Sequence, residues 1–193
     1  MRSGWIPWKI APPNGRSTEA SYGETFLKYM AFARPDANYD WTTFNLDTDL
    51  DRMQVSREML DAGDADLSRF KARGGKIVTY IGWADPAVNP LMSVRYYEDV
   101  AQRFGPTTGE FFKLFMVPGM FHCGGGVGVS TFDALTPPVE WVEKGVAPQS
   151  IMGSRVVDDK VTRKRPLCPY PQVAKYKGSG SVDDASNFVC SAP

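Results

Sequence analysis

The run Lys76-Ile77-Val78-Thr79-Tyr80-Ile81 constrains the fold more than any other segment of the sequence. Nearly every position in it is apolar or β-branched, without the polar alternation of a strand that faces water on one side. Strands of this kind are covered on both faces, as the parallel strands of α/β sheets are. The segment therefore predicts a buried strand in a parallel sheet.

A second unit of the same kind follows along the chain. Leu91–Phe104 has apolar residues at helical spacing and ends at Gly105-Pro106. Phe111–Val117 is again almost continuously apolar, and Phe132–Lys144 predicts another helix, with two prolines near its start. Two strand–loop–helix units within about 70 residues predict an α/β fold, a parallel sheet with flanking helices.

The two ends of the chain have less regular patterns. Residues 1 to 24 hold prolines and glycines between isolated aromatics and predict a loop, followed by a short helix at 24–34. Residues 39–51 are acidic but lack the glycine and closing glutamate of a calcium loop, which favours a solvated turn. The tail, 163–193, is rich in proline and glycine and predicts a loop on the surface. We therefore divide the chain into a loop-rich segment, 1–60, and an α/β part, 61–193.

Charge and apolar patterning exclude several classes of partner. The 193 residues carry 22 basic and 22 acidic side chains, so the formal net charge is zero. A nucleic-acid or anionic-membrane surface is bound by a basic excess or a long basic block, and the chain has neither. No apolar run approaches the roughly 18 residues of a membrane-spanning helix. We expect neither nucleic acid nor a membrane as a partner, and the three cysteines are not spaced as metal ligands usually are.

Two side chains that suit proton transfer follow the two predicted strands. Asp85 lies four residues beyond Ile81, and His122, the single histidine, lies five residues beyond Val117. Catalytic groups of open α/β sheets gather at the carboxyl ends of the strands, so adjacent parallel strands would present both side chains at one edge. In acyl-transfer triads an acid orients an imidazole, which deprotonates a nucleophile, and α/β-hydrolases carry the acid before the histidine.

Each of these residues also has a structural interpretation. An aspartate before proline is most often a turn residue, and a lone histidine beside glycines is often a buried or capping side chain. Because Asp85 and His122 occupy equivalent positions after two strands, we weigh a catalytic role for the pair equally with a purely structural role.

Four segments of the sequence closely resemble the tannase and feruloyl esterase family. They are Gly74-Gly75-Lys76-Ile77, Gly82-Trp83-Ala84-Asp85-Pro86, the run from Phe115 to Gly126, and the proline-rich run from Arg165 to Gly180. The similarity extends over residues 64 to 190. A cysteine directly after the histidine and a proline-rich tail that holds cysteines are unusual in other hydrolases, so these motifs are specific.

The resemblance implies an α/β-hydrolase that carries a large lid domain, whose end would be the first 60 residues. It implies hydrolysis of small aromatic esters such as gallates, hydroxycinnamates or terephthalate half-esters, with Asp85 as triad acid and His122 as base and without a cofactor. It also implies a disulfide between Cys168 and Cys190, and a role for Cys123 in bonding a cysteine beside the nucleophile. Such a disulfide favours a secreted or periplasmic protein. Calcium, which lids of this family bind, has no clear ligands in the sequence.

The nucleophilic serine of that family has no counterpart in this sequence. Ser21, Ser130 and Ser179 all lack the strand–turn–helix context of a nucleophile elbow. We therefore expect the chain to be the carboxyl-terminal part of the enzyme, with the amino-terminal part or a second copy as its partner. Two alternatives remain: a non-catalytic remnant, and a shortened esterase that has recruited a serine, with Ser130 or Ser21 as the candidates.

Overall fold

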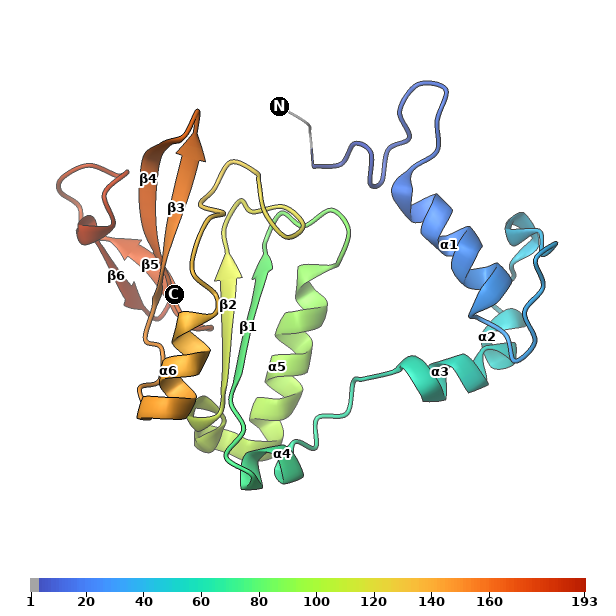
Figure 1. Cartoon of the computed structure of the whole chain (residues 1–193), viewed down its shortest axis with the longest axis horizontal. Coiled ribbons are helices and arrows are strands. Elements are labelled where there is room, and N and C mark those ends of the chain that lie inside the picture. The colour runs from blue at the N-terminus through green and yellow to red at the C-terminus, as the bar shows by residue number, and fades with distance from the viewer. Residues whose placement is uncertain (1–3) are drawn as a thin grey trace. The chain divides into compact units, whose positions relative to one another are not determined.

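The computed structural model describes residues 4–193, which divide after Asp64 into two compact units (Figure 1). Unit 1 ends at Asp64, and unit 2 runs from Ala65 to Pro193. The division lies a few residues beyond the one drawn from the sequence at 60/61. Both predicted active-site residues belong to unit 2.

Unit 1 is helical and begins its first helix earlier than the sequence suggested. Helix α1 spans Thr18–Tyr29, and the side chain of Ser17 caps it by accepting the Ala20 N–H. The predicted helix is present, but its predicted bounds of 24–34 are wrong, and the predicted loop is wrong from residue 18 onward. The serine cap and the acidic Glu19 in the first turn start the helix before Gly23, which a helix tolerates at a cost of about 1 kcal/mol relative to alanine.

The acidic segment 39–51 is more ordered than the predicted solvated turn. It forms a 3₁₀ turn at Trp41–Thr43 and the start of helix α2, Asp49–Arg52, which α3, Gln54–Leu60, follows. Asp49 is buried because it has internal partners. Its carboxylate accepts the Asn45 N–H at 2.9 Å and pairs with the Arg52 guanidinium at 2.6 Å.

Unit 2 is built on the predicted pair of parallel strands. Strand β1, Ile77–Gly82, runs parallel to β2, Phe112–Val117, in a register that pairs the two strands from end to end. The short α4, Ser68–Ala72, precedes β1, and α5, Pro90–Phe104, connects the strands. The expectation of a parallel pair linked by a helix is confirmed.

Helix α6, Thr136–Lys144, follows β2 and starts later than the predicted residue 132. Asp133 accepts the N–H groups of Leu135 and Thr136 in a turn, which delays the start of the helix. Pro137 then lies in the first turn, where its missing N–H and fixed φ cost nothing. Figure 1 shows α5 and α6 on either side of the β1–β2 pair.

The alternation of β2 side chains explains why both faces of the sheet are covered. Leu114 and Met116 pack with Val94 of α5 on one face. Phe115 and Val117 point the opposite way, into a cluster with four other buried residues: Met120, Val129, Ile151 and Leu167. Burying an aliphatic or aromatic side chain of this size stabilises the fold by about 1.5–3 kcal/mol.

The predicted loop at 163–193 contains the end of strand β4, Lys160–Leu167, and the strands β5, Val173–Tyr176, and β6, Phe188–Ser191. An antiparallel hairpin joins β3, Ile151–Val157, to β4, and a second antiparallel pair joins β5 to β6. These strands have polar residues on exposed faces, so they lack the apolar run that marked β1 and β2. The prediction of a loop at 163–193 is therefore wrong for the end of β4 and for β5 and β6, and β3 was not predicted at all.

The tail also closes one edge of the parallel sheet. Tyr170 N–H donates to Leu114 C=O at 2.7 Å, and Pro169 bridges Phe115 of β2. Within residues 4–193, β1 has β2 as its only strand neighbour. The outer edge of β2 is therefore covered by this chain, whereas the outer edge of β1 is not paired by any described strand.

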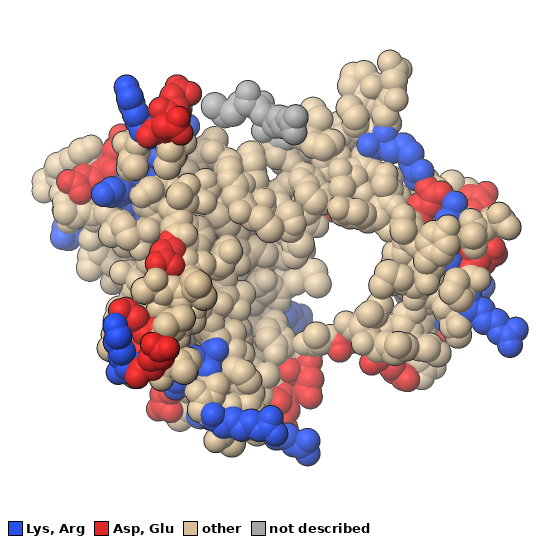
Figure 2. All heavy atoms as spheres, viewed as in Figure 1, with Lys and Arg blue, Asp and Glu red and all other residues tan. Residues whose placement is uncertain are grey.

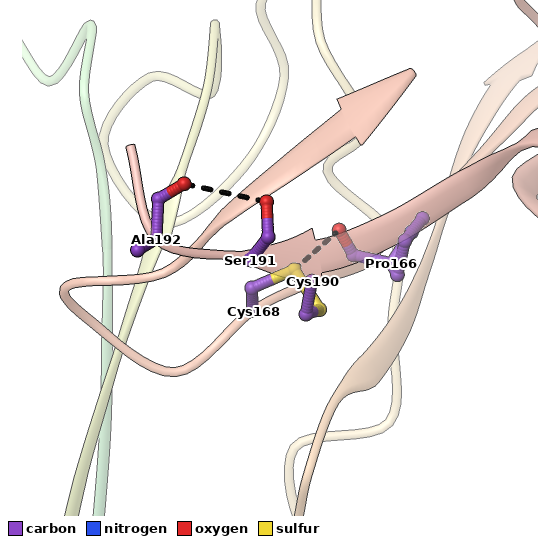
Figure 3. Close-up of a disulfide and its surroundings, with 5 residues drawn as sticks. All are labelled: Pro166, Cys168, Cys190, Ser191 and Ala192. Atoms are coloured by element: carbon purple, nitrogen blue, oxygen red, sulfur yellow. Dashed lines mark hydrogen bonds between the residues drawn. A yellow bond between two sulfur atoms is a disulfide. The ribbon is translucent and has the colours of Figure 1, made fainter. Parts of the chain in front are cut away.

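A disulfide holds this tail together. Cys168, just beyond β4, is bonded to Cys190 of β6, 22 residues further along the chain (Figure 3). This is the pairing that the family resemblance implied, and it leaves Cys123 as an exposed free thiol.

We predict that removing the disulfide by Cys168→Ala/Cys190→Ala lowers the free energy of unfolding by about 3 kcal/mol, because the cross-link restricts the unfolded chain. Urea denaturation of both proteins measures the difference. The control is Cys123→Ser, an exposed thiol whose loss should change stability by less than about 0.5 kcal/mol. Equal stability of the double variant and the native chain, or non-reducing peptide maps that place Cys123 in a disulfide, would contradict the prediction.

Candidate active site

Asp85 lies in the turn between β1 and α5 and is fixed by backbone groups. Its Oδ1 accepts the N–H groups of Ala87 at 2.8 Å and Val88 at 2.9 Å, so one carboxylate oxygen closes the turn that leads into the helix. The side chain is only 4 % exposed. This turn leaves the other oxygen, Oδ2, to face the loop that follows β2.

His122 lies at the tip of a tight hairpin that follows β2. Met120 forms an isolated bridge with Gly126, and the Phe121 N–H donates to Gly125 C=O. Gly125 has a φ of 69°, in the left-handed region that glycine adopts without strain. The hairpin thus holds His122 close to the carboxyl end of β1, with its side chain one third exposed.

The structure brings the two predicted residues together. His122 Nδ1 lies 3.0 Å from Asp85 Oδ2, within hydrogen-bonding distance. An ionised carboxylate can only accept, so this contact places the ring proton on Nδ1. The other ring nitrogen, Nε2, is then the basic one, which is the tautomer that general-base catalysis on a hydroxyl requires.

The surroundings of Asp85 keep its carboxyl group ionised. Burial by itself raises the pKa of this group, because it disfavours the charge. The Val88 N–H, His122 and the Ala87 N–H act in the opposite direction and outweigh burial, so the pKa of Asp85 lies below its ordinary value. The turn that sets the position of the carboxylate therefore also keeps it charged.

The sequence identified both side chains but missed the groups that orient them. The two backbone N–H donors of Ala87 and Val88 could have been expected, since an aspartate before proline commonly closes a turn of this kind. The bond between the Ala84 N–H and Met120 C=O, 3.1 Å long, had no such signal. It joins two loops that are more than thirty residues apart in the sequence.

None of the three serines considered from the sequence lies in a nucleophile elbow. Ser21 is inside α1 and donates its hydroxyl to Ser17 C=O. Ser130 precedes the bridge between Thr131 and Ser154, and its N–H also donates to Ser154 C=O. Ser179 lies in the turn region between β5 and β6. A nucleophile elbow needs a strand before the serine and a helix after it.

The described residues offer neither a metal cluster nor a membrane-spanning helix. Between residues 4 and 193, no group of three or more His, Cys, Asp or Glu side chains is arranged to hold a metal ion. Within the same range no helix combines the length and apolar character needed to cross a membrane. Figure 2 shows basic and acidic side chains interspersed on the face in view. Several ion pairs join such side chains in the described residues, such as Arg163 with Asp183 at 2.5 Å.

A comparison with known protein families identifies the family of this chain. A family model described as tannase and feruloyl esterase matches residues 1–191. The chain belongs to the tannase and feruloyl esterase family. The match includes unit 1 as well as the α/β unit, although the motifs that we recognised lie only beyond residue 64.

Relatives and solved structures agree with this membership. An uncharacterized esterase of Xanthomonas campestris is 39% identical and aligns with 96% of this chain and 39% of its own. A mono(2-hydroxyethyl) terephthalate hydrolase of Piscinibacter sakaiensis is 36% identical over 98% of this chain and 35% of its own. The crystal structure of an esterase from Aspergillus oryzae matches 92% of this chain and 38% of its own, with a TM-score of 0.78 and 30% identity.

The chain thus spans little more than a third of the length of the relatives that it matches. A feruloyl esterase B from Aspergillus oryzae, 24% identical with a TM-score of 0.75, shares the fold over 96% of this chain and 44% of its own. The likeness supports the α/β arrangement of unit 2.

We predict that the stabilising contribution of Asp85 is present at neutral pH and lost in acid. Because folding lowers the pKa of Asp85, its ionised form favours the folded state above the ordinary value near 4, and this contribution disappears as the pH falls through the lowered pKa. Urea unfolding of the native chain and of Asp85→Asn should therefore differ most at neutral pH. The difference should shrink as the pH falls below the ordinary value near 4 and continue to shrink as the carboxyl group becomes protonated in the folded state.

The matched control is Asp99→Asn, on the exposed surface of α5. It should change the free energy of unfolding by less than about 0.5 kcal/mol throughout the range. A difference between the native chain and Asp85→Asn that stays constant with pH would contradict the lowered pKa.

Proposed function

We propose that this chain is the part of a carboxylic ester hydrolase that supplies the acid and the base of a Ser-Asp-His triad. The observation that carries the proposal is the 3.0 Å contact between His122 Nδ1 and Asp85 Oδ2 at the ends of adjacent parallel strands. Membership of the tannase and feruloyl esterase family supports the same assignment. In this proposal unit 2 holds the carboxyl-terminal strands of an α/β-hydrolase sheet, and unit 1 is the end of a lid.

The chemical steps follow from the tautomer that Asp85 imposes. His122 Nε2 accepts the proton of a serine hydroxyl while the serine oxygen attacks the ester carbonyl carbon. The tetrahedral intermediate collapses with breakage of the ester C–O bond, and the imidazolium returns the proton to the departing alcohol. Water, deprotonated by the same Nε2, then attacks the acyl-enzyme, the imidazolium returns that proton to the departing serine oxygen, and the carboxylic acid is released. Asp85 stays ionised throughout and stabilises the imidazolium.

The nucleophile in this proposal comes from a segment of the family fold outside these 193 residues. The two strand-to-helix connections of unit 2 are 83–89, which has no serine, and 118–135, in which Ser130 adjoins a β-bridge. The relatives align with this chain over only 35–39% of their length, so the family fold has ample further chain to carry a nucleophile elbow. The outer edge of β1 is the place for a further parallel strand, because the tail already covers β2.

The substrate in this proposal is an ester of an aromatic acid. The names of two relatives support this substrate class. They are the mono(2-hydroxyethyl) terephthalate hydrolase and a probable feruloyl esterase from Aspergillus terreus that is 33% identical. Trp83, two residues before Asp85, is 43% exposed and lines a mostly apolar cavity with Met116 and Tyr170. An exposed aromatic side chain this close to the site is suited to stacking on an aromatic acyl group.

The Cys168–Cys190 disulfide supports a place in an oxidising compartment, so the proposal includes secretion or export to a periplasm. Disulfides are rare in the cytosol, where thiols are kept reduced.

We predict that the purified chain hydrolyses nitrophenyl esters of aromatic acids no faster than its His122→Ala variant. A positioned histidine contributes about 10² to 10⁴-fold, but only with a nucleophile within hydrogen-bonding reach. A chimaera tests the full proposal: this chain replaces the matching carboxyl-terminal part of the Xanthomonas campestris esterase. The chimaera should hydrolyse these esters, and Asp85→Ala or His122→Ala should each reduce kcat/KM by at least about 100-fold.

Two controls separate the competing functions. Ser130→Ala should leave the activity of the chimaera unchanged, whereas a recruited serine at this position predicts its loss. Asp99→Asn, a surface acid on α5, should also have no effect. Turnover by the isolated chain that His122→Ala abolishes would overturn the need for a further segment. An inactive chimaera that folds and binds the ester would favour a non-catalytic role.

A further inference from the structure

A backbone hydrogen bond joins the loop that carries Asp85 to the hairpin that carries His122. The Ala84 N–H donates to Met120 C=O over 3.1 Å. Ala84 directly precedes Asp85, and Met120 lies two residues before His122. The contact therefore joins the two loops within two residues of each functional side chain.

Gly82 makes this contact possible because it has no side chain. A Cβ at this position would lie 2.1 Å from Met120 O, 2.7 Å from Met120 C and 2.9 Å from Phe121 O. Carbon atoms do not approach backbone atoms this closely, so an alanine at 82 would have to displace the hairpin. The φ of Gly82 is not in the left-handed region, so space is the reason for a glycine at this position.

The hairpin cannot yield by a small local movement. The side chain of Met120 is 1 % exposed and packs in the cluster with Phe115, Val117 and Leu167. The two arms of the hairpin also lie close together, because a Cβ on Gly126 would lie 2.0 Å from Gly119 O. A displacement of Met120 C=O is therefore passed on to His122 as a movement of the whole tip.

The Asp85 side is equally fixed. Its Oδ1 is held by two backbone N–H groups in the turn before α5, so the carboxylate cannot follow a shifted imidazole. A hydrogen bond weakens steeply when the donor–acceptor distance grows or the donor–hydrogen–acceptor angle bends away from linear. A shift of the hairpin by about 1 Å, the scale at which site geometry costs activity, would break the bond between the two side chains.

We propose that Gly82 is a positioning residue, which sets the distance between His122 and Asp85 by giving Met120 C=O the space that a side chain would fill. The proposal deepens the proposed function, because it concerns the same pair of side chains. Gly82 touches neither the substrate nor the reacting atoms and acts only through the hairpin.

The test uses the chain as it is and requires no turnover. His122 is the single histidine of the sequence, so the imidazole ¹⁵N and imidazole N–H signals of the ¹⁵N-labelled protein belong to it alone. In the native chain we expect the pattern of a ring protonated at Nδ1, with a low-field Nδ1 proton bonded to carboxylate. Asp85→Asn provides the reference spectrum for the lost partner.

Gly82→Ala should lose the low-field proton and move the ring signals towards those of Asp85→Asn. The matched control is Gly109→Ala in the same unit, where a Cβ would meet only Lys113 Nζ at 3.4 Å. This variant should keep the native His122 signals. A folded Gly82→Ala protein with native His122 signals overturns the proposal.

Where Gly82→Ala does not give the dispersed amide spectrum of a folded protein, hydrogen exchange of the native chain decides. The Ala84 amide should exchange more slowly than in an unstructured peptide, by at least about tenfold, if its bond to Met120 C=O persists. Exchange at the unstructured rate overturns the proposal. These readouts are independent of the nucleophile and the substrate, so an inactive chimaera and a failed positioning role are distinguishable.

Discussion

The parallel pairing of β1 with β2 is the interaction on which the rest of unit 2 depends. It places the carboxyl ends of the strands side by side, since Gly82 pairs with Val117. The loops that leave these ends therefore start next to each other, and each has only a few residues in which to present one side chain. Residues 37 positions apart in the sequence can then form a 3.0 Å contact without a long or flexible connection.

The contact between Asp85 and His122 is held by backbone groups on both sides. The carboxylate closes the turn before α5, and the imidazole stands on a hairpin whose glycines allow a tight bend. Few side-chain rotamers need to be fixed, because the backbone already sets both directions. The same N–H donors that hold Asp85 lower its pKa, so position and charge have a common origin.

The two outer edges of the parallel pair differ, because the tail covers the edge of β2 and no described strand pairs with the edge of β1. The tail covers β2 through the segment that ends in Tyr170, and the Cys168–Cys190 disulfide ties that segment to β6. Edge strands with free N–H and C=O groups invite pairing with another strand, and the outer edge of β1 has no described strand to satisfy it. The arrangement of unit 2 is therefore suited to extension on the β1 side, the direction in which the proposed function places the nucleophile.

The sequence alone determined the elements with strong local signals. The apolar runs of β1 and β2 predicted buried strands, and the equivalent offsets of Asp85 and His122 predicted their meeting. The sequence misplaced α1 and missed β3–β6, because a serine cap before a glycine and strands with polar, exposed faces carry weak local patterns. Only the tertiary structure decided the space at Gly82, the bond from Ala84 to Met120 and the covered edge of β2. These depend on backbone atoms of segments far apart in the chain, and backbone atoms leave no pattern in a sequence.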